Sequence, residues 1–456
     1  MIRAARGLVL QVVFNMRQRG RMMAALFGAG LVLFSMAGEG DAAPVADPQI
    51  GVNFIRFAWP TRGPRADEAF DDSFLIEDLE NLGVDAVRQL VRADLLWREV
   101  EPEDDAWDFS RSDRILQSVP GTPIVTLFSM QYASPTPPWA GQGEFQRTLG
   151  PEAKDYLDTV VKRYRDHVRY WEVGNEMDHW RIADPDASPR RGGKEPPHRP
   201  TGGFSPQEQG AFIAEVAQYI RARDPDAVIV LPGMAGLSPY VLETWLPGVV
   251  RGAGKDAFDV VNYHYYGSWQ DQARARERLR KSIRRLGLDD KPVWLTETGS
   301  TASPTLRMRT DYPNGPPSQA ADVFRRSLQA WAAGDSLVLW HTHLSSPERP
   351  QNRWRLYGLR RSDGTMLPSW HSFKLLTTEV TPFAAVTPVG GLDFGQYGFR
   401  VQRRDGGLRW VFWGRGSVSP PEGARRWTWI SPVGQGHEWS LLQGDLELDE
   451  EPLLVR

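Results

Sequence analysis

Eight short apolar runs, separated by longer amphipathic segments, constrain the fold of this 456-residue chain more than any other feature. Several of them are continuously apolar, as expected of strands that are buried on both faces. Strands that alternate with helices predict a parallel sheet, and eight repeats predict an α/β fold, the (β/α)8 or TIM barrel. An open doubly wound sheet is the alternative, but no Gly-rich phosphate loop follows an early run. The runs lie at residues 50–57, 86–91, 124–128, 168–173, 227–231, 258–263, 293–296 and 337–340.

The segments between these runs carry helix start and stop signals. Ser205 and Glu208 have the spacing of a capping box, and Pro206 would occupy the first helical position. Gly287 follows an amphipathic segment at 270–286, where a glycine typically ends a helix. The arginines of that segment are interpreted as a solvated helix face.

The pattern divides the chain into three parts. Residues 1–48 form an N-terminal segment, residues 49–380 the barrel, and residues 381–456 a β-rich appendage. In the last part, short strand-like runs are separated by Gly, Pro, Asp and Ser, which predicts a small β domain of sandwich-like character. This domain would either brace the barrel or bind glycan.

The N-terminal segment has the layout of a secretory signal peptide. Arg17, Arg19 and Arg21 precede a mostly apolar run at 22–37, and small residues follow. The run is shorter than the roughly 20 residues of a bilayer span. The sequence therefore predicts export to the periplasm or the extracellular space, with an uncleaved N-terminal anchor as the alternative. No other membrane association is predicted.

Composition excludes several kinds of chemistry. The chain has no Cys, which rules out disulfides, thiol nucleophiles and zinc–thiolate sites. A formal net charge of −3 gives no reason to expect a nucleic-acid partner. No cofactor is predicted, and the sequence gives no indication of oligomeric state. Trp is abundant, with 18 residues, which is compatible with surfaces that stack on sugar rings.

Two glutamates stand at the ends of predicted barrel strands. Glu176 follows the fourth run in WEVGNE, and Glu297 follows the seventh in WLTETG. Active sites of such barrels lie at the C-terminal ends of the strands, so both carboxyl groups are expected at one mouth. Retaining glycosidases use a pair of carboxyl groups about 5–5.5 Å apart, one as acid/base and one as nucleophile. The pair therefore suggests cleavage of glycosidic bonds.

Further motifs stand in order and in register with the predicted strands. Together they resemble glycoside hydrolase clan A, and within it the family 39 and family 5 type, over residues 49–380. Besides the two glutamate motifs, they are VRQLVRADLLWREVEPEDDAWDFS at 87–110, NYHYYG at 262–267, Trp340 and LYGLRRSDGTMLPSW at 356–370.

The resemblance implies a role for each matching residue. Glu176 would be the acid/base and Glu297 the nucleophile. Arg88 would hold Glu297 ionised, and Tyr266 would donate a hydrogen bond to it. The remaining matches would bind or tune the substrate site: Asn175 would contact the sugar 2-hydroxyl, His264 would tune proton transfer beside the acid/base, and Trp340 would form the platform beneath the reacting sugar.

Other candidates are more open. His341 and His343 would share a face if the eighth strand continued, but the sequence offers no third ligand, and no metal is predicted. Trp139, Trp180 and Trp269 lie in expected loops at the barrel mouth, where they would either line sugar subsites or pack in the core.

The leading hypothesis is an exported retaining β-glycoside hydrolase. Its substrate would be a polysaccharide or oligosaccharide, and the polar insert at 178–203, after the fourth strand, favours endo-action. A transglycosylase with the same glutamates is an alternative. A glycan-binding barrel without turnover is another, because barrels host many functions.

Overall fold

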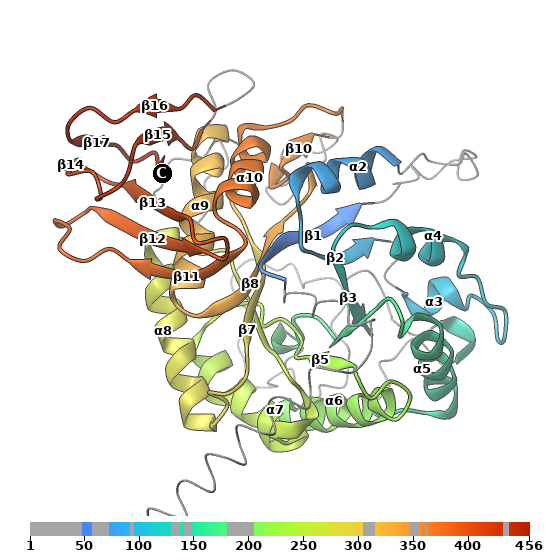
Figure 1. The fold of residues 1–456 in the computed structure, drawn as a ribbon. Coiled ribbons are helices and arrows are strands. Elements are labelled where there is room, and N and C mark those ends of the chain that lie inside the picture. Colours follow the sequence, from blue (N-terminus) through green and yellow to red (C-terminus); the bar gives the residue numbers. More distant parts are fainter. Residues whose placement is uncertain are drawn as a thin grey trace, which may run out of the picture. The chain divides into compact units, whose positions relative to one another are not determined.

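The computed structural model of the chain describes residues 48–56, 73–91, 95–128, 137–140, 148–179, 205–303, 315–345, 356–361, 363–431 and 437–456. Pro48–Arg456 form one compact unit. Within these described ranges, eight parallel strands form the central sheet (Figure 1). They are β1 (Ile50–Arg56), β2 (Ala86–Val91), β3 (Thr122–Leu127), β4 (Tyr170–Val173), β5 (Val228–Val230), β6 (Val261–Tyr265), β7 (Val293–Thr298) and β8 (Asp335–His341).

The central sheet is a ring. Its strand order is β5-β4-β3-β2-β1-β8-β7-β6, so every neighbouring pair is parallel and β1 lies beside β8. Parallel bridges from Val230 to Val260 and from Met234 to Tyr263 join the two remaining edges. The fold is therefore the predicted (β/α)8 barrel, and the open doubly wound sheet is excluded because its edges would remain unpaired.

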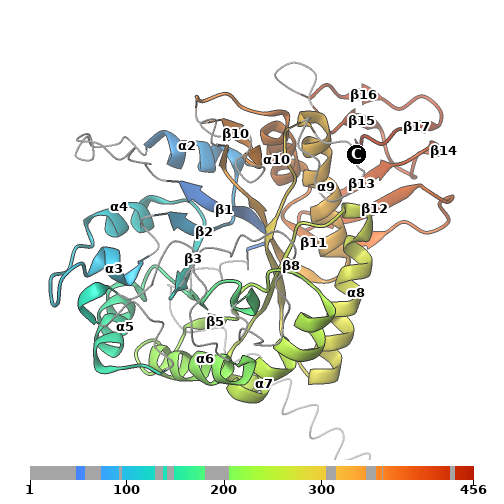
Figure 2. The same ribbon diagram turned by 180° about the vertical axis from the view of Figure 1, so that it is seen from behind.

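Helices cover the outside of the ring. In Figure 2, α5, α6, α7 and α8 follow one another around the sheet. The predicted capping box is confirmed, because Ser205 and Glu208 exchange side-chain-to-backbone hydrogen bonds at the start of α6. Gly287 ends α8 with a left-handed backbone (φ 63°). The helices are α2 (Ser73–Leu82), α3 (Trp97–Val100), α4 (Ser110–Ser118), α5 (Pro151–Tyr164), α6 (Pro206–Arg221), α7 (Leu246–Ala253), α8 (Trp269–Leu286), α9 (Pro316–Ala332) and α10 (Pro368–Glu379).

β6 and β7 run further than their sequence pattern indicates, and β8 extends beyond its predicted run at both ends. The run at 258–263 corresponds to β6, which extends to Tyr265, and the run at 293–296 corresponds to β7, which extends to Thr298. The apolar pattern stops early because the upper inner wall of this barrel is polar. As a result His264 and Glu297 lie within strands, in register with each other.

Short elements connect the main ones. A one-turn helix, η2, follows β4 directly and begins one residue after Glu176. A two-stranded parallel sheet follows β8 and leads toward α10. These elements are η1 (Pro138–Ala140), η2 (Met177–His179), the π-helical η3 (Val241–Trp245), η4 (Lys255–Ala257), β9 (Leu344–Ser345) and β10 (Arg360–Arg361).

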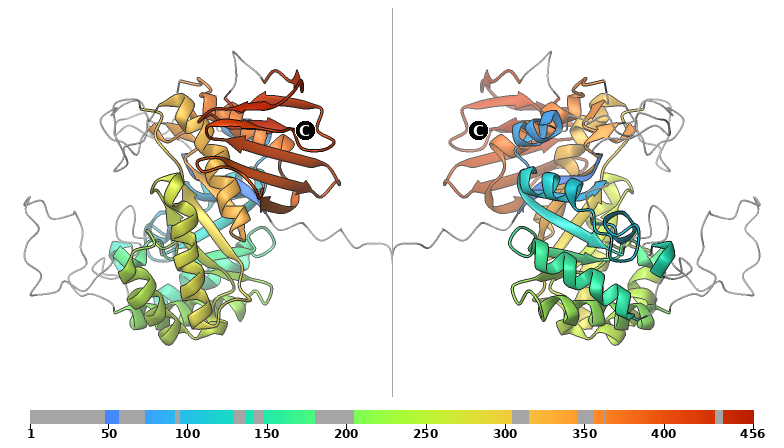
Figure 3. Two further views of the ribbon diagram at one scale, coloured as in Figure 1. Left: turned by 90° about the vertical axis from the view of Figure 1, so that its left-hand side faces the viewer. Right: turned by 90° about the vertical axis from the view of Figure 1, so that its right-hand side faces the viewer.

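The C-terminal part is a β domain beside α9 and α10 (Figure 3). Its main sheet has the order β11-β12-β13-β18-β15-β16, and β14 pairs with β17. The Ser372 hydroxyl of α10 donates to the Ile430 carbonyl, and Arg456 and Arg409 both pair with Glu379 at the end of α10. The strands are β11 (Phe383–Pro388), β12 (Tyr397–Arg403), β13 (Leu408–Trp413), β14 (Gly416–Val418), β15 (Arg426–Trp429), β16 (Ser440–Leu441), β17 (Leu446–Leu448) and β18 (Leu453–Val455).

Candidate active site

The inner face of the barrel changes from apolar to polar toward the C-terminal ends of six strands, β2, β3, β4, β6, β7 and β8. Since alternate strand residues face the same side, a residue two positions further on shares the inner face of the one before it. Ala86, Ile124, Tyr170, Val260, Trp294 and Leu339 belong to one buried apolar cluster. The residues two positions further on are all polar and buried: Arg88, Thr126, Glu172, Asn262, Thr296 and His341. This polar layer is the floor of the barrel mouth.

Arg88 is the centre of this floor, and its side chain is completely buried. Nε and Nη2 donate to the two oxygens of Glu172 at 2.6 and 2.9 Å. Nη2 also donates to Asn175 Oδ1 at 2.6 Å, while Nη1 donates to Asn53 Oδ1 at 2.9 Å and to Glu297 Oε1 at 3.0 Å. Burial by itself would lower the pKa of Arg88, but the two carboxylates raise it above its usual value. One fixed cation therefore orients both glutamates and both amides.

Glu172 was not identified from the sequence, although it stands in the same motif as Glu176. Its side chain has no solvent exposure. Besides Arg88, it accepts hydrogen bonds from Thr126 Oγ1 at 2.8 Å, from the Gly233 backbone N–H at 2.9 Å and from Asn262 Nδ2 at 2.9 Å. A buried carboxylate needs such hydrogen-bond partners, because burial removes its contacts with water. Glu172 therefore serves to position Arg88. The strand alternation that places it inside was the available signal.

Glu297 is the buried carboxylate of the mouth, with a side chain that is 4 % exposed. Next to this residue, β7 shifts register in its pairing with both neighbouring strands, β6 and β8. Such an irregularity re-aims a side chain, and here the carboxylate meets Arg88 through Oε1 and the Tyr266 hydroxyl through Oε2, at 2.7 Å. Burial alone would raise the pKa of Glu297, but it is lowered to about 2, first by the charge of His264, then by that of Arg88 and by the Tyr266 hydrogen bond; His341 adds to this effect only in acid, where it becomes protonated.

Glu176 reaches the mouth through an unusual backbone. Gly174, just after β4, has φ 86°, and Glu176 itself has φ 49°. A non-glycine residue in this left-handed region is strained by roughly 1–3 kcal/mol, and such strain is concentrated at functional sites. The Glu176 N–H donates to the Gly233 carbonyl at 3.0 Å, which holds the conformation. Its side chain is 26 % exposed, so Glu176 faces solvent while Glu297 does not.

His264 lies between the two glutamates. Its Nδ1 is 2.9 Å from Glu176 Oε1 and 3.6 Å from Glu297 Oε2, and the ring is fully buried. Burial would lower the pKa of His264, but the two carboxylates raise it above its usual value. A second imidazole, that of His179, approaches the other oxygen of Glu176 at 3.6 Å. The pair Glu176–His264 is therefore a place where a proton can be held.

The two carboxyl groups are close together. One oxygen of Glu176, one of Glu297 and a nitrogen of His264 all lie within 4.8 Å of one another. Three such atoms could also hold a metal ion. Both oxygens of Glu297 already accept hydrogen bonds from Arg88 and Tyr266, so this arrangement favours an ion-pair network. A second acidic group, Glu101 with Asp105 and Asp155, shares no residue with this one.

The structure brings six of the seven predicted site residues together: Glu176, Glu297, Arg88, Asn175, His264 and Tyr266. Trp340 is not among them. It lies on the opposite face of β8 from Leu339, is 2 % exposed, and donates from Nε1 to the Tyr357 carbonyl at 3.0 Å. Because side chains alternate along a strand, its neighbour His341 faces the mouth instead.

The other candidate residues are more dispersed. His343 pairs with Asp78 at 2.6 Å, away from His341, so the two imidazoles do not form a common site. Trp269 is buried against the C-terminal domain, and Trp139 donates to the Glu101 carbonyl at 3.0 Å. Trp180, residues 180–203 of the polar insert and residues 1–47 of the N-terminal segment lie outside the described residues.

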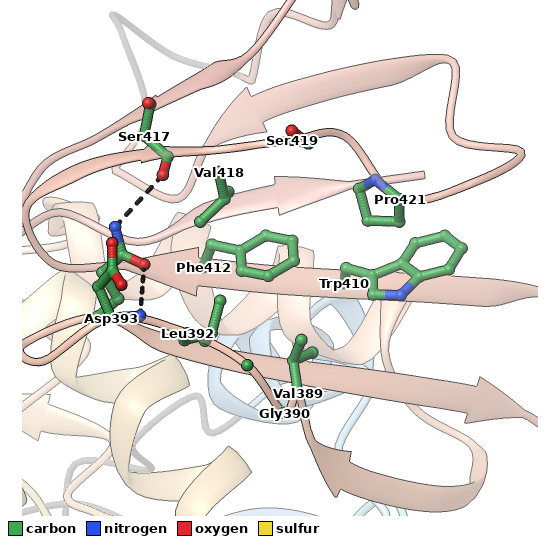
Figure 4. A pocket seen from close by; sticks show the side chains of 12 residues that line it. Val389, Gly390, Leu392, Asp393, Trp410, Phe412, Ser417, Val418, Ser419 and Pro421 are labelled. Carbon is green, nitrogen blue, oxygen red and sulfur yellow. Dashed lines mark hydrogen bonds between the residues drawn. The ribbon is translucent and has the colours of Figure 1, made fainter.

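A hollow of about 370 Å³ lies in the C-terminal domain, between β13, β14 and the loop after β11 (Figure 4). Trp410, Phe412 and Val418 are among the residues that line it. Its polar residues already have partners within the chain: Gln396 bonds to the Ser417 carbonyl and the Asp393 N–H. Its lining shares no residue with the barrel mouth.

In the described ranges, no helix is long and apolar enough to cross a membrane.

Comparison with solved structures identifies the same fold elsewhere. A family 39 glycoside hydrolase from Bacteroides cellulosilyticus is similar with a TM-score of 0.58 and 16 % identity, over 89 % of this chain and 80 % of that one. A family 39 β-xylosidase from Caulobacter crescentus gives a TM-score of 0.57 and 17 % identity, over 92 % and 97 %. An α-L-arabinofuranosidase from Thermotoga maritima gives 0.57 and 12 %, over 90 % and 96 %.

No protein-family model matches the sequence, and no curated protein matches it. The likeness to the solved structures therefore concerns the fold. It extends over about nine-tenths of this chain, and it confirms the predicted resemblance to the barrels of glycoside hydrolase clan A at the level of fold.

Proposed function

We propose that this chain is a retaining glycoside hydrolase that cleaves O-glycosidic bonds by double displacement. One observation carries the proposal: oxygens of Glu176 and Glu297 lie within 4.8 Å of each other at the mouth of the barrel. Retaining enzymes hold their carboxyl groups about 5–5.5 Å apart, whereas inverting enzymes need roughly 6.5–9.5 Å to admit a water molecule. The short separation supports direct attack by a carboxylate.

The environments of the two glutamates divide the work between them. Glu297 is buried and has a pKa of about 2, so it is ionised and attacks the anomeric carbon. Glu176 is partly exposed and touches His264, so it gives a proton to the departing glycosidic oxygen. In the second half of the reaction, Glu176 takes a proton from water, and the water oxygen displaces Glu297 from the sugar.

The surrounding groups assist this chemistry. Tyr266 is neutral because its pKa is well above the usual value, first through burial and then through the charge of Glu297, so its hydroxyl donates to the nucleophile. Asn175 accepts from Arg88 through Oδ1, which turns its Nδ2 donor to the other side. That donor is suited to a sugar hydroxyl. Such contacts strengthen as the transition state forms.

In the resting site, His264 would hold the proton that Glu176 later needs. Arg88 and a protonated His264 offset the charges of Glu297 and Glu176. When a substrate enters and water leaves, the proton shared by His264 and Glu176 would move to the carboxylate, which makes Glu176 the acid. The return of that proton to His264 would follow deglycosylation.

The proposed substrate is a polysaccharide or oligosaccharide. The similarity to a β-xylosidase and to an α-L-arabinofuranosidase supports a carbohydrate substrate. Endo-action, export and the signal peptide remain proposals that rest on the sequence. The length of the first products would test the mode of action, and N-terminal sequencing of secreted protein would test export. A transglycosylase would transfer glycan to an added acceptor sugar, and a binding protein would bind glycan without cleaving it.

The test is release of reducing ends from a panel of polysaccharides and chromogenic β-glycosides. Glu176→Gln and Glu297→Gln should each lose most of the activity of the wild type. Glu152→Gln, on the exposed face of α5, is the matched control and should keep it. Wild-type protein that is folded but inactive on the whole panel would count against a hydrolase, and full activity in Glu297→Gln would refute the site.

Azide would separate the roles of the two glutamates. In Glu176→Ala, azide replaces the water that needs a base, so an activated substrate should yield a glycosyl azide of retained configuration. In Glu297→Ala, azide replaces the carboxylate nucleophile, so the product should have inverted configuration. The same configuration from both variants would contradict the assigned roles.

A further inference from the structure

His341 occupies the inner wall of the mouth at the end of β8. Like Leu337 and Leu339, the alternate residues before it, His341 faces the inside of the barrel. Its side chain is 10 % exposed. Its Nδ1 lies 3.9 Å from Glu297 Oε2. His341 therefore stands beside the carboxylate to which the sugar would become attached.

The hydrogen bonds around His341 fix its protonation. A guanidinium has only donors, so the Asn53 oxygen must face Arg88, as the 2.9 Å contact shows. The Asn53 amide nitrogen, which only donates, then faces His341 Nδ1 at 3.0 Å. Nδ1 must accept this bond, so the imidazole is neutral and carries its proton on Nε2. Arg88 thus sets the tautomer of His341 through Asn53.

The electrostatic surroundings agree with this tautomer. Burial lowers the pKa of His341, and so do the positive charges of His264 and Arg88. The carboxylates of Glu297 and Glu176 raise it, but the outcome is a pKa of about 4. Two aromatic rings hold the imidazole edge-on: Tyr266 at 5.7 Å and Tyr357 at 6.2 Å between centroids. Among the described residues, the titratable or charged groups that face it include Glu297, Glu176, His264, Arg88, Tyr266 and Tyr357.

We infer that His341 is a specificity-determining residue that contacts the sugar, donating a hydrogen bond from Nε2 to an oxygen of the ring held against Glu297. This inference rests on the proposed function. A neutral donor is suited to this place, because Arg88 and a protonated His264 already supply positive charge beside Glu297. A site that hydrogen-bonds a substrate hydroxyl discriminates strongly against an analogue that lacks it. The ligand is therefore a glycoside with a hydroxyl at the position that His341 reaches.

Two substitutions separate this role from a structural one. Asn places an acceptor where Nδ1 lies, so His341→Asn keeps the bond from Asn53 but loses the Nε2 donor. Gln places a donor near the Nε2 position, so His341→Gln keeps a donor but loses the acceptor. His167→Asn and His167→Gln, at an exposed histidine after α5, are the matched controls.

The experiment measures kcat and KM for the best glycoside and for its monodeoxy analogues, with the thermal midpoint of each variant. We expect His341→Asn to lower kcat/KM about 10- to 100-fold, with the thermal midpoint within a few degrees of wild type. His341→Gln should recover part of that loss. Against one deoxy analogue, the preference of the wild type for the parent should nearly disappear in His341→Asn.

Two results would overturn the inference. One is a His341→Asn variant whose preference for the parent over every deoxy analogue equals that of wild type, which would make the residue structural. The other is a better rescue by Asn than by Gln, which would assign the role to the bond with Asn53. Failure of the proposed function is a separate result, since wild type itself would then cleave no glycoside.

Discussion

The Nε atom of Arg88 lies 2.6 Å from Glu172 Oε2, and neither side chain has any solvent exposure. An ion pair at this depth is stable only while both charges are present, because an unpaired buried charge is very costly. Arg88 also reaches Glu297, so the deeper pair fixes the cation that faces the proposed nucleophile. The stability of the floor and the position of the reactive carboxylate therefore depend on the same guanidinium.

We expect Glu172→Gln to lower the free energy of unfolding by about 3 kcal/mol, in the range for removal of one partner from a buried pair. Denaturant unfolding would measure the loss. The exposed control Glu152→Gln should change it by less than about 0.5 kcal/mol. If Glu172→Gln is as stable as the control, the floor tolerates a neutral partner and the argument fails.

A glycine maintains the position of His264. A Cβ added at Gly233 would lie 2.0 Å from His264 Nε2, so Gly233→Ala must displace the imidazole or the backbone. Overpacking of this kind costs about 1–3 kcal/mol. We expect a loss of stability of that size and a fall in kcat of tenfold or more, because the bond between His264 and Glu176 would lengthen.

Gly236→Ala is the matched control for that substitution. A Cβ at Gly236 has no neighbour within 4 Å, and the residue follows β5 by only a few positions, as Gly233 does. Steady-state kinetics and thermal unfolding of both variants would suffice. Equal activity of the two alanine variants would show that the imidazole can shift without consequence.

The sequence was sufficient to predict the barrel and most of the mouth. Alternation of strands and helices depends on local periodicity, which the eight runs display clearly. The capping box at Ser205 and the terminal glycine at 287 are local as well, and both were found. The glutamate motifs could be placed because barrel strands carry their functional side chains at one end.

What could not be predicted depends on strand faces and on partners distant in sequence. Trp340 and His341 are adjacent, and only the register of β8 with β1 decides which of them faces the mouth. Glu172 is separated by 84 positions from Arg88 and by 61 from Gly233, so its hydrogen bonds leave no local pattern. Short C-terminal strands such as β14 and β16 are formed by pairing alone.

The pH dependence of stability should divide into separate ranges. Glu297 (pKa about 2 folded, 4.5 ordinarily) and His341 (about 4 folded, 6.5 ordinarily) both bind protons more readily in the unfolded chain. Stability is therefore lost as pH falls, from 6.5 to 4 through His341 and from 4.5 to 2 through Glu297. Each difference corresponds to about 3 kcal/mol. The pKa of His264 is raised, so its contribution to stability depends on pH in the opposite way: it is greatest below pH 6.5 and is lost as pH rises.

Two variants should each act mainly on one of these ranges, although Glu297 and His341 also influence each other's pKa. In urea unfolding at a series of pH values, His341→Asn should flatten the decline between pH 6.5 and 4, and Glu297→Gln the decline below 4.5. Unchanged curves in both variants would mean that other groups cause the acid sensitivity.

Activity should depend on pH with an alkaline limit set by the pair of Glu176 and His264. The raised pKa of His264 keeps the shared proton in place below and somewhat above pH 6.5. As pH rises through that pKa, the proton is lost and kcat/KM should fall. His264→Gln should lower kcat and move this limit, since Gln cannot hold the proton. An alkaline limit that is identical in His264→Gln and wild type would exclude the imidazole as its source.

The C-terminal domain should support the proposed active site through the loop after β6. Trp269, at the start of α8, packs against Tyr397 at 5.1 Å and Trp413 at 5.9 Å between ring centroids. On α9, Arg326 donates to the Gly267 carbonyl at 2.9 Å. These contacts hold the segment that follows Tyr266, whose hydroxyl binds Glu297, so a disturbance of the interface is expected to reach the nucleophile.

We therefore expect Tyr397→Ala to lower both the thermal midpoint and kcat, the latter several-fold, with little change in KM. Trp439→Ala is the control: it removes a half-buried aromatic ring of the same domain, one that is covered by the Arg456 guanidinium at 3.7 Å. It should reduce stability without changing kcat. If the two variants lose stability and kcat to the same extent, the domain contributes only general stability. If Tyr397→Ala alone lowers kcat, the β domain positions Tyr266, which requires the barrel and its appendage to act as one catalytic unit.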